Sequence, residues 1–226
     1  MSSTTARNVG NRERSSVERV AWVGILGTLF FIIVVVALHF LRPEYNPAAR
    51  FISEFAVGPY GWLMTVAFFA LGLASFAIAF GIQKTLSPSR MRQIGTGLIG
   101  VFGVGVLLAG TFPTDVQGGP ITTTGAIHDG VSLLSFVAVI VGIFVNSRGF
   151  ARDPRWKSYG IVSTALGVAT LVAFIGLFVS FGSAWVGASQ RIFVGVFLLW
   201  LLLMATRIRS IASGSREPLT GQLPTG

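Results

Sequence analysis

The sequence predicts an all-α fold: a polytopic membrane protein made of a bundle of six transmembrane helices, with both termini on the cytoplasmic side. Composition supports this class, since 52% of the 226 residues are hydrophobic and 11% are charged, whereas soluble domains carry about a quarter charged residues. Run length supports it too, because six segments contain the roughly 20 mostly apolar residues that a helix needs to cross the hydrocarbon core. The placement of Lys and Arg residues sets the orientation.

The six predicted spans occupy residues 20–208, and the connections between them are too short to hold a soluble domain. They are Val20–Leu41, Tyr60–Gln83, Gln93–Phe112, Ala126–Asn146, Ser158–Phe181 and Ala188–Ile208. The first run is longer than the apolar region of a signal peptide and no small-x-small cleavage site follows it, so we expect it to remain as an anchor. Residues 1–19 are predicted to form a basic cytoplasmic tail, and residues 209–226, rich in Gly, Ser and Pro, a disordered cytoplasmic tail.

Basic residues are sorted between alternate connections. All of the 17 Lys and Arg residues except Arg42, Arg50 and Arg191 lie in the two tails or in the second and fourth loops. Because basic residues stay on the cytoplasmic side, the first, third and fifth loops should face outward from a prokaryotic plasma membrane. A net charge of +9 spread over four juxtamembrane segments is typical of contact with anionic lipids. The predicted partners are therefore membrane lipids, and no nucleic acid is expected.

Two patterns limit the chemistry. The chain has no cysteine, which excludes disulfides, thiolate nucleophiles and cysteine-type zinc sites. The stretch Gly95–Gly100 fits the G-x-G-x-x-G dinucleotide pattern, but no strand precedes it, so we expect no bound cofactor. We interpret the glycines of this span as a small-residue surface that lets the third helix pack closely on its neighbours; they are Gly95, Gly97, Gly100, Gly103, Gly105 and Gly110.

Ionisable residues outside the basic segments all fall on the predicted outer side. Each has an ordinary explanation: Asp129 lies in the first turns of a helix, where a negative charge is favourable, and Glu54 can pair with Arg50 four residues before it. Together they predict one outer site, because prolines and glycines restrict the loops that carry them. The group comprises Glu44, Glu54, Asp115, Asp129, His39, His128 and Arg191, and the polar Gln190 lies beside Arg191.

Three stretches of the sequence resemble a known family. They are "FISEFAVGPYGWLMTVAFFALGLA" from Phe51, "GTFPTD" from Gly110 and "GAIHDG" from Gly125, and they look like the signature segments of the family called domain of unknown function 998. The resemblance covers most of the chain and implies a prokaryotic integral membrane protein with six helices. The family carries no general activity, so function has to be argued from residues.

Three functions fit the outer polar set. The one we favour is a protein whose outer pocket binds a lipid headgroup, a small ligand or a partner protein through Ser53, Glu54, Asp115, His128 and Arg191. An outer-leaflet lipid-modifying hydrolase or transferase could use Glu54, Asp115 and His128 as acid, base or ligand groups. A transporter is less favoured because the span midsections contain no ionisable residue. No zinc-binding spacing is present, so no metal is predicted, and Glu54, Asp115 and His128 are expected to converge on one cavity.

The orientation can be tested with single cysteines, because the chain has none of its own. In intact cells, an impermeant maleimide should label Gln117→Cys, in the third loop, and spare Ser87→Cys, in the second loop. The measurement is labelling before and after cell lysis. Labelling of Ser87→Cys alone in intact cells would reverse the predicted orientation.

Overall fold

The computed structural model describes residues 3–214, and it describes side chains from Ser15 onward. The chain folds into six α-helices and one 3-10 helix, and no strand occurs in the described part. In chain order they are α1 (Ser3–Leu41), η1 (Ile52–Ala56), α2 (Gly61–Thr85), α3 (Arg90–Thr111), α4 (Thr123–Phe150), α5 (Lys157–Val179) and α6 (Val186–Gly214). Each α-helix contains a segment long and apolar enough to cross a membrane. The predicted all-α fold with six spans is confirmed.

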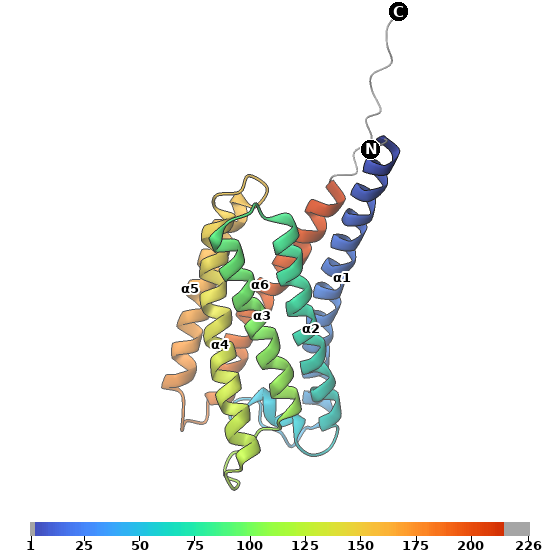
Figure 1. The fold of residues 1–226 in the computed structure, drawn as a ribbon. Helices are drawn as coiled ribbons and strands as arrows, with labels where there is room; N and C mark the ends of the chain where they lie inside the picture. The colour runs from blue at the N-terminus through green and yellow to red at the C-terminus, as the bar shows by residue number, and fades with distance from the viewer. Residues whose placement is uncertain (1–2, 215–226) are drawn as a thin grey trace, which may run out of the picture.

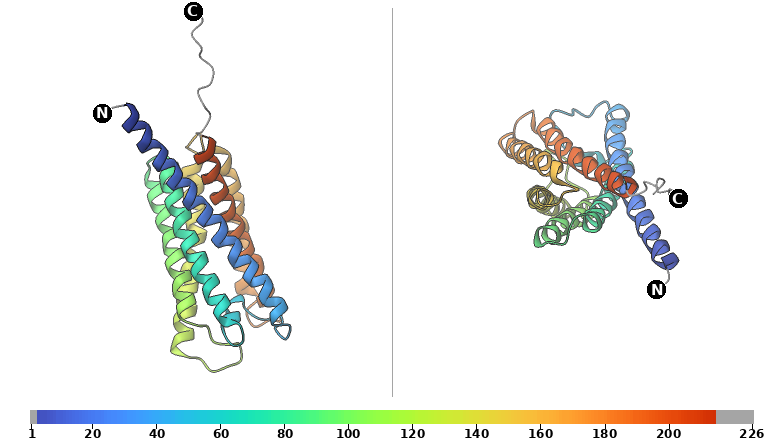
Figure 2. Two further views of the ribbon diagram at one scale, coloured as in Figure 1. Left: turned by 90° about the vertical axis from the view of Figure 1, so that its right-hand side faces the viewer. Right: turned by 90° about the horizontal axis from the view of Figure 1, so that it is seen from above.

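The six helices form a closed ring. Each helix packs on the next one in the chain, α6 closes the ring against α1, and α2 also reaches α6. Figures 1 and 2 show the helices running antiparallel along one axis, so that α1 begins and α6 ends at the same end of the bundle. We call this the terminal end. The opposite end, formed by residues 42–60, 112–122 and 180–185, is called the loop-one end.

Helix boundaries extend beyond the apolar runs because polar residues continue or cap the helices. Ser89 accepts a hydrogen bond from the Arg92 amide at 3.1 Å, and Thr122 accepts one from the Gly125 amide at 3.0 Å, as N-cap side chains do. Apolar run length reports only the part of a helix that meets hydrocarbon. The predicted starts at Gln93 and Ala126 are therefore a turn too late.

The two predicted tails are partly helical. The helix α1 begins at Ser3, so residues 3–19 of the predicted basic tail belong to it, and its candidate span is Ser15–Leu41. At the other end, α6 continues to Gly214, so residues 209–214 are helical and the prediction of disorder from 209 is wrong there. The rest of that predicted tail, 215–226, lies outside the described residues.

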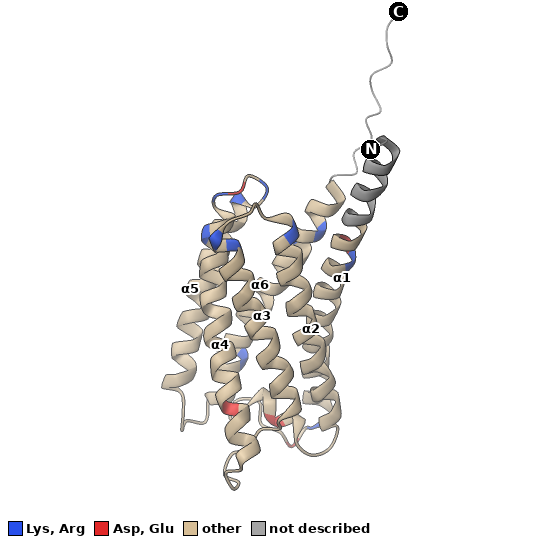
Figure 3. Ribbon diagram, viewed as in Figure 1, with Lys and Arg blue, Asp and Glu red and all other residues tan. Residues whose placement is uncertain are grey.

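Charge is distributed unevenly along the bundle axis. Figure 3 shows most Lys and Arg residues near the terminal end, whereas acidic residues lie at both ends, including the loop-one end. The basic group with described side chains includes Lys84, Arg90, Arg92, Arg148, Arg152, Arg155, Lys157, Arg207 and Arg209. The sorting seen in the sequence thus corresponds to the two ends of one bundle. Which end faces the cytoplasm stays a prediction, for which this asymmetry is the argument.

Glycines let α3 pack closely on its neighbours, but not at every position of the run. A Cβ at Gly103 would lie 3.1 Å from the carbonyl oxygen of Gly72 on α2, so these helices approach more closely than side chains would allow. No heavy atom comes within 4 Å of a Cβ added at Gly97 or Gly100. The expected glycine surface is therefore real at Gly103 and its packed neighbours, and wrong at Gly97 and Gly100.

Candidate functional site

A cavity of about 290 Å³ lies inside the bundle towards the loop-one end. Its walls come from all six α-helices and the η1 segment, and most of the lining is aromatic or aliphatic. Phenylalanines dominate the lining, and they are Phe31, Phe51, Phe68, Phe102, Phe136, Phe174, Phe178, Phe181 and Phe197. Small-molecule sites in proteins are typically concave, largely apolar and carry a few polar groups. The cavity has this character.

The cavity opens sideways, between α4 and α5. Midway along α5 these helices are close, since a Cβ at Gly167 would lie 3.1 Å from the Phe144 ring on α4. Towards the loop-one end they diverge, as Figure 1 shows. Lining residues on both sides of this gap are exposed: Leu133 on α4 by 46% and Phe178 at the end of α5 by 48%. The mouth therefore faces the surroundings of the bundle within the length of the spans.

His128 supplies a polar group to one wall. It is buried, and its Nδ1 lies 2.8 Å from the Phe112 carbonyl oxygen and 3.1 Å from that of Ala109. Carbonyl oxygens only accept hydrogen bonds, so Nδ1 carries a proton, and in the neutral imidazole Nε2 is then the acceptor. The end of α3 thus fixes the tautomer of His128.

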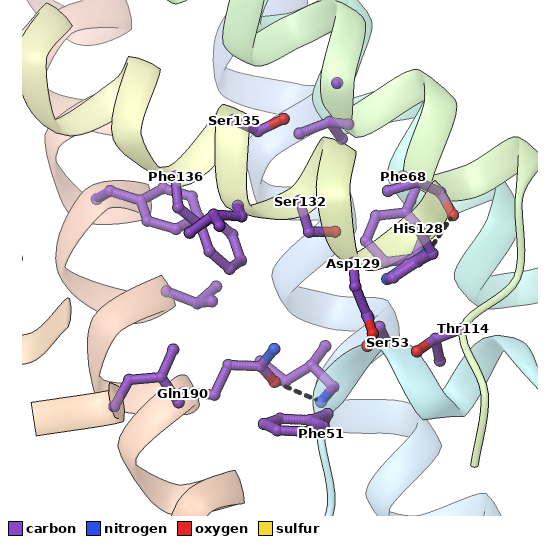
Figure 4. A pocket seen from close by; sticks show the side chains of 18 of the residues that line it. Phe51, Ser53, Phe68, Thr114, His128, Asp129, Ser132, Ser135, Phe136 and Gln190 are labelled. Carbon is purple, nitrogen blue, oxygen red and sulfur yellow. Dashed lines mark hydrogen bonds between the residues drawn. The ribbon is translucent and has the colours of Figure 1, made fainter. Parts of the chain in front are cut away.

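Three more polar residues line the cavity near His128. Figure 4 shows Asp129 and Ser53 pointing toward the same part of the cavity, with Ser132 one turn further along α4. Ser53 is buried, yet its hydroxyl has no hydrogen-bond partner among the described residues. Asp129 forms no ion pair within that same part of the chain. These groups are available to a ligand.

The first loop, residues 42–60, contains η1 and closes the cavity at the loop-one end. The Ile52 amide donates a hydrogen bond to Oε1 of Gln190 on α6 at 2.7 Å (Figure 4), and the Ala188 amide donates to the Ala48 carbonyl at 2.9 Å. A Cβ at Gly187 would overlap the Arg50 backbone, so the first turn of α6 lies directly against this segment. The segment is an ordered part of the bundle.

Arg191 holds the same segment from a second side. Its Nη1 donates to the Arg50 carbonyl at 2.7 Å, and its Nε donates to Nε2 of His39 at 3.1 Å. His39 in turn donates from Nδ1 to the Val35 carbonyl at 2.6 Å. Arg191 does not line the cavity. Its observed contacts are structural, and the ligand-binding role predicted for it stays a prediction.

Glu54 is the most deeply buried carboxylate at this end, with 1% of the residue exposed. Its Oε2 forms an ion pair with Arg50 at 2.9 Å and accepts from the Gln117 amide at 3.2 Å, while Oε1 accepts from the Phe51 amide at 3.0 Å. Arg50 also donates to the Gln117 carbonyl at 3.2 Å. Glu54 thus joins the first loop to the third loop, and it does not line the cavity.

Asp115 organises the third loop. Its two carboxylate oxygens accept from the Thr122 amide and hydroxyl, both at 2.8 Å. An added Cβ at Gly125 would overlap this carboxylate, so Asp115 packs on the first turn of α4. Asp115 is absent from the cavity lining. Glu54, Asp115 and His128 were expected to converge on one cavity. Of the three, His128 lines this cavity, and Glu54 and Asp115 do not.

The burial of Tyr45 follows from the same packing. Burial is the main cause that raises the pKa of this phenol, and the nearby negative charge of Glu54 raises the pKa further. The hydroxyl therefore stays protonated and donates to the Phe51 carbonyl. Arg50 lies over the Tyr45 ring at 5.7 Å from its centroid, which adds a cation–π contact.

The sequence analysis identified some of the residues that line the cavity and missed others. Ser53 and His128 line it as predicted, whereas Asp129 had been assigned to the helix dipole and Gln190 only to the outer group. Ser132 carried a usable signal, because its spacing of four from His128 places both on one helix face. Among the described side chains, no three His, Asp or Glu residues come close enough to hold a metal ion.

These features define a multi-pass helical membrane protein with an internal cavity that opens between α4 and α5. The family model described as "Protein of unknown function (DUF998)" matches residues 25–207. The chain belongs to this family, as the three stretches of sequence indicated. Comparison with curated proteins and with solved structures gives no match.

The structural role of Glu54 predicts a loss of stability when its charge is removed. Glu54→Gln should lower the free energy of unfolding by about 2 kcal/mol, because Arg50 and the Gln117 amide lose a charged partner. For a chain of this size that corresponds to a drop of roughly 5 °C in Tm, measurable by circular dichroism in detergent. Glu44→Gln is the control, since Glu44 is exposed and paired only with Arg42; equal Tm values for the two variants would contradict the assignment.

Proposed function

We propose that the protein binds an amphiphile, a membrane lipid or a lipid-like molecule, within the cavity between α4 and α5. The apolar part of the ligand lies against the phenylalanines, and its polar end lies beside His128, Asp129 and Ser53. The observation that carries this proposal is the combination of a largely apolar lining with a mouth at Leu133 and Phe178. We place the protein in a prokaryotic plasma membrane with the loop-one end outward, which would put the ligand in the outer leaflet.

The apolar lining supports a chain-bearing ligand over a polar one. Burying apolar surface contributes roughly 25 cal/mol per Å², and an aliphatic chain offers such surface to Phe136, Phe174 and Phe178. A soluble polar molecule would gain little from these walls. It would also lose hydration on entering a site with few hydrogen-bonding groups.

Binding without chemistry is favoured over the lipid-modifying hydrolase or transferase. His128 alone supports the enzyme, because its Nε2 is free to accept a proton. The carboxylates predicted to assist it are committed elsewhere, Glu54 to Arg50 and two amides, and Asp115 to Thr122. Asp129 shares the cavity, but His128 Nδ1 is bonded to the carbonyls of Ala109 and Phe112, so no carboxylate orients the imidazole. A binding protein needs no such assistance.

A pair of adjacent leucines on α4 tests the proposal. Leu133 lines the cavity at its mouth, whereas Leu134 is 61% exposed and lies outside the lining. Leu133→Trp should fill the mouth with an indole ring and reduce lipid retention severalfold, because the entering chain and the ring would compete for one volume. Leu134→Trp is the matched control. The measurement is mass spectrometry of lipids extracted after size-exclusion chromatography, and equal retention by both variants would refute the site.

A further inference from the structure

The charge of the cavity points to the chemistry of the ligand's polar end. Among the residues that line it, Asp129 and His128 are the titratable ones. Asp129 has neither an ion pair nor a hydrogen bond to any described residue. Asp129 is exposed and also lines the cavity, so a ligand can reach its carboxylate. No Lys or Arg lines the cavity, and His128 is the lining residue that can carry a positive charge.

The three arginines at the loop-one end are engaged elsewhere. Arg42 pairs with Glu44. Arg50 pairs with Glu54 and donates to the Gln117 carbonyl. Arg191 donates to His39 and to the carbonyls of Arg50 and Gly187. None of them lines the cavity. An anionic headgroup would therefore meet the Asp129 charge without a cationic partner.

The polar groups beside Asp129 suit a donor-rich cation. His128 has Nδ1 committed to two carbonyls, so in the neutral imidazole Nε2 is the acceptor. The hydroxyls of Ser53 and Ser132 also line the cavity and have no hydrogen-bond partner among the described residues. An ammonium group carries three N–H donors and no acceptor. A carboxylate, an imidazole nitrogen and hydroxyl oxygens are the acceptors that such a group requires.

We propose that the cavity recognises a primary ammonium group carried by an apolar chain, with Asp129 as its counter-ion and His128 Nε2 and Ser53 as hydrogen-bond acceptors. This inference rests on the proposed function and specifies its ligand as an amine-bearing amphiphile, such as an amine-headgroup lipid. A free small amine shares the same headgroup chemistry but would leave the apolar walls unused. The test has to separate these two sources.

The experiment compares ligands of one chain length and different polar ends. Native mass spectrometry of the full chain in an uncharged detergent would measure binding of dodecylamine, dodecanol, dodecanoate and ethanolamine. Dodecylamine should bind at least about tenfold more tightly than dodecanol, with dodecanoate weakest, because only the amine gains the Asp129 charge. Ethanolamine should bind far more weakly than dodecylamine, because it lacks the chain.

Variants assign the preference to Asp129. Asp129→Asn should bring dodecylamine and dodecanol within about twofold of each other, whereas Asp129→Glu should keep a clear preference for the amine. Glu44→Gln, which removes one negative charge from the same end outside the cavity, should leave the preference unchanged. Because Asp129 has no partner among the described residues, the Tm of Asp129→Asn should match that of the parent.

The outcomes separate this inference from the proposed function. Equal binding of dodecylamine and dodecanol, unaltered in Asp129→Asn, would overturn ammonium recognition and leave amphiphile binding standing. If none of the three chain-bearing ligands binds, the proposed function fails and this inference fails with it. Ethanolamine binding as tightly as dodecylamine would support the ammonium site and exclude a lipid as its source.

Discussion

The buried carboxylate of Glu54 is the constraint on which the loop-one end depends. A charged group with 1% of its residue exposed must be paired and hydrogen-bonded, because an unpaired buried charge costs several kcal/mol. Arg50 and the amides of Phe51 and Gln117 meet that requirement, and they come from the first and third loops. Satisfying one carboxylate therefore brings two distant loops together over the end of the bundle.

The cavity is a consequence of this closure. With the first loop held by Glu54, Gln190 and Arg191, η1 places Ser53 opposite α4, where His128 and Asp129 enter the same space. The helices α4 and α5 diverge where the loops close the end, so the opening lies at the side. Fixed polar groups beside a lateral apolar opening are what a site for a membrane-embedded amphiphile requires, because such a ligand arrives from the bilayer.

Six spans, the uneven charge and the candidates Ser53 and His128 could be predicted from the sequence, since run length and charge position are local properties. The sequence did not predict that Glu54 and Asp115 hold the loops together and lie outside the cavity. Glu54 accepts from an amide 63 residues away, and no local pattern reveals such a partner. The phenylalanine lining was equally hidden, because phenylalanines occur throughout the spans and only helix packing selects those that face inward. Gly100 resembled Gly103 in sequence, yet only Gly103 meets another backbone.

The central claim is that an amphiphile occupies the space between α4 and α5. Photo-crosslinking with a lipid that carries a diazirine in its chain, followed by peptide mapping of the full-length protein in bilayers, tests it most directly. If an amphiphile occupies this space, cross-links will concentrate at Phe136, Phe174 and Phe178, which line the cavity. Cross-links confined to Ile161, Val168 and Val172, which are exposed on α5 outside the lining, would show that lipid only surrounds the bundle and would contradict the account.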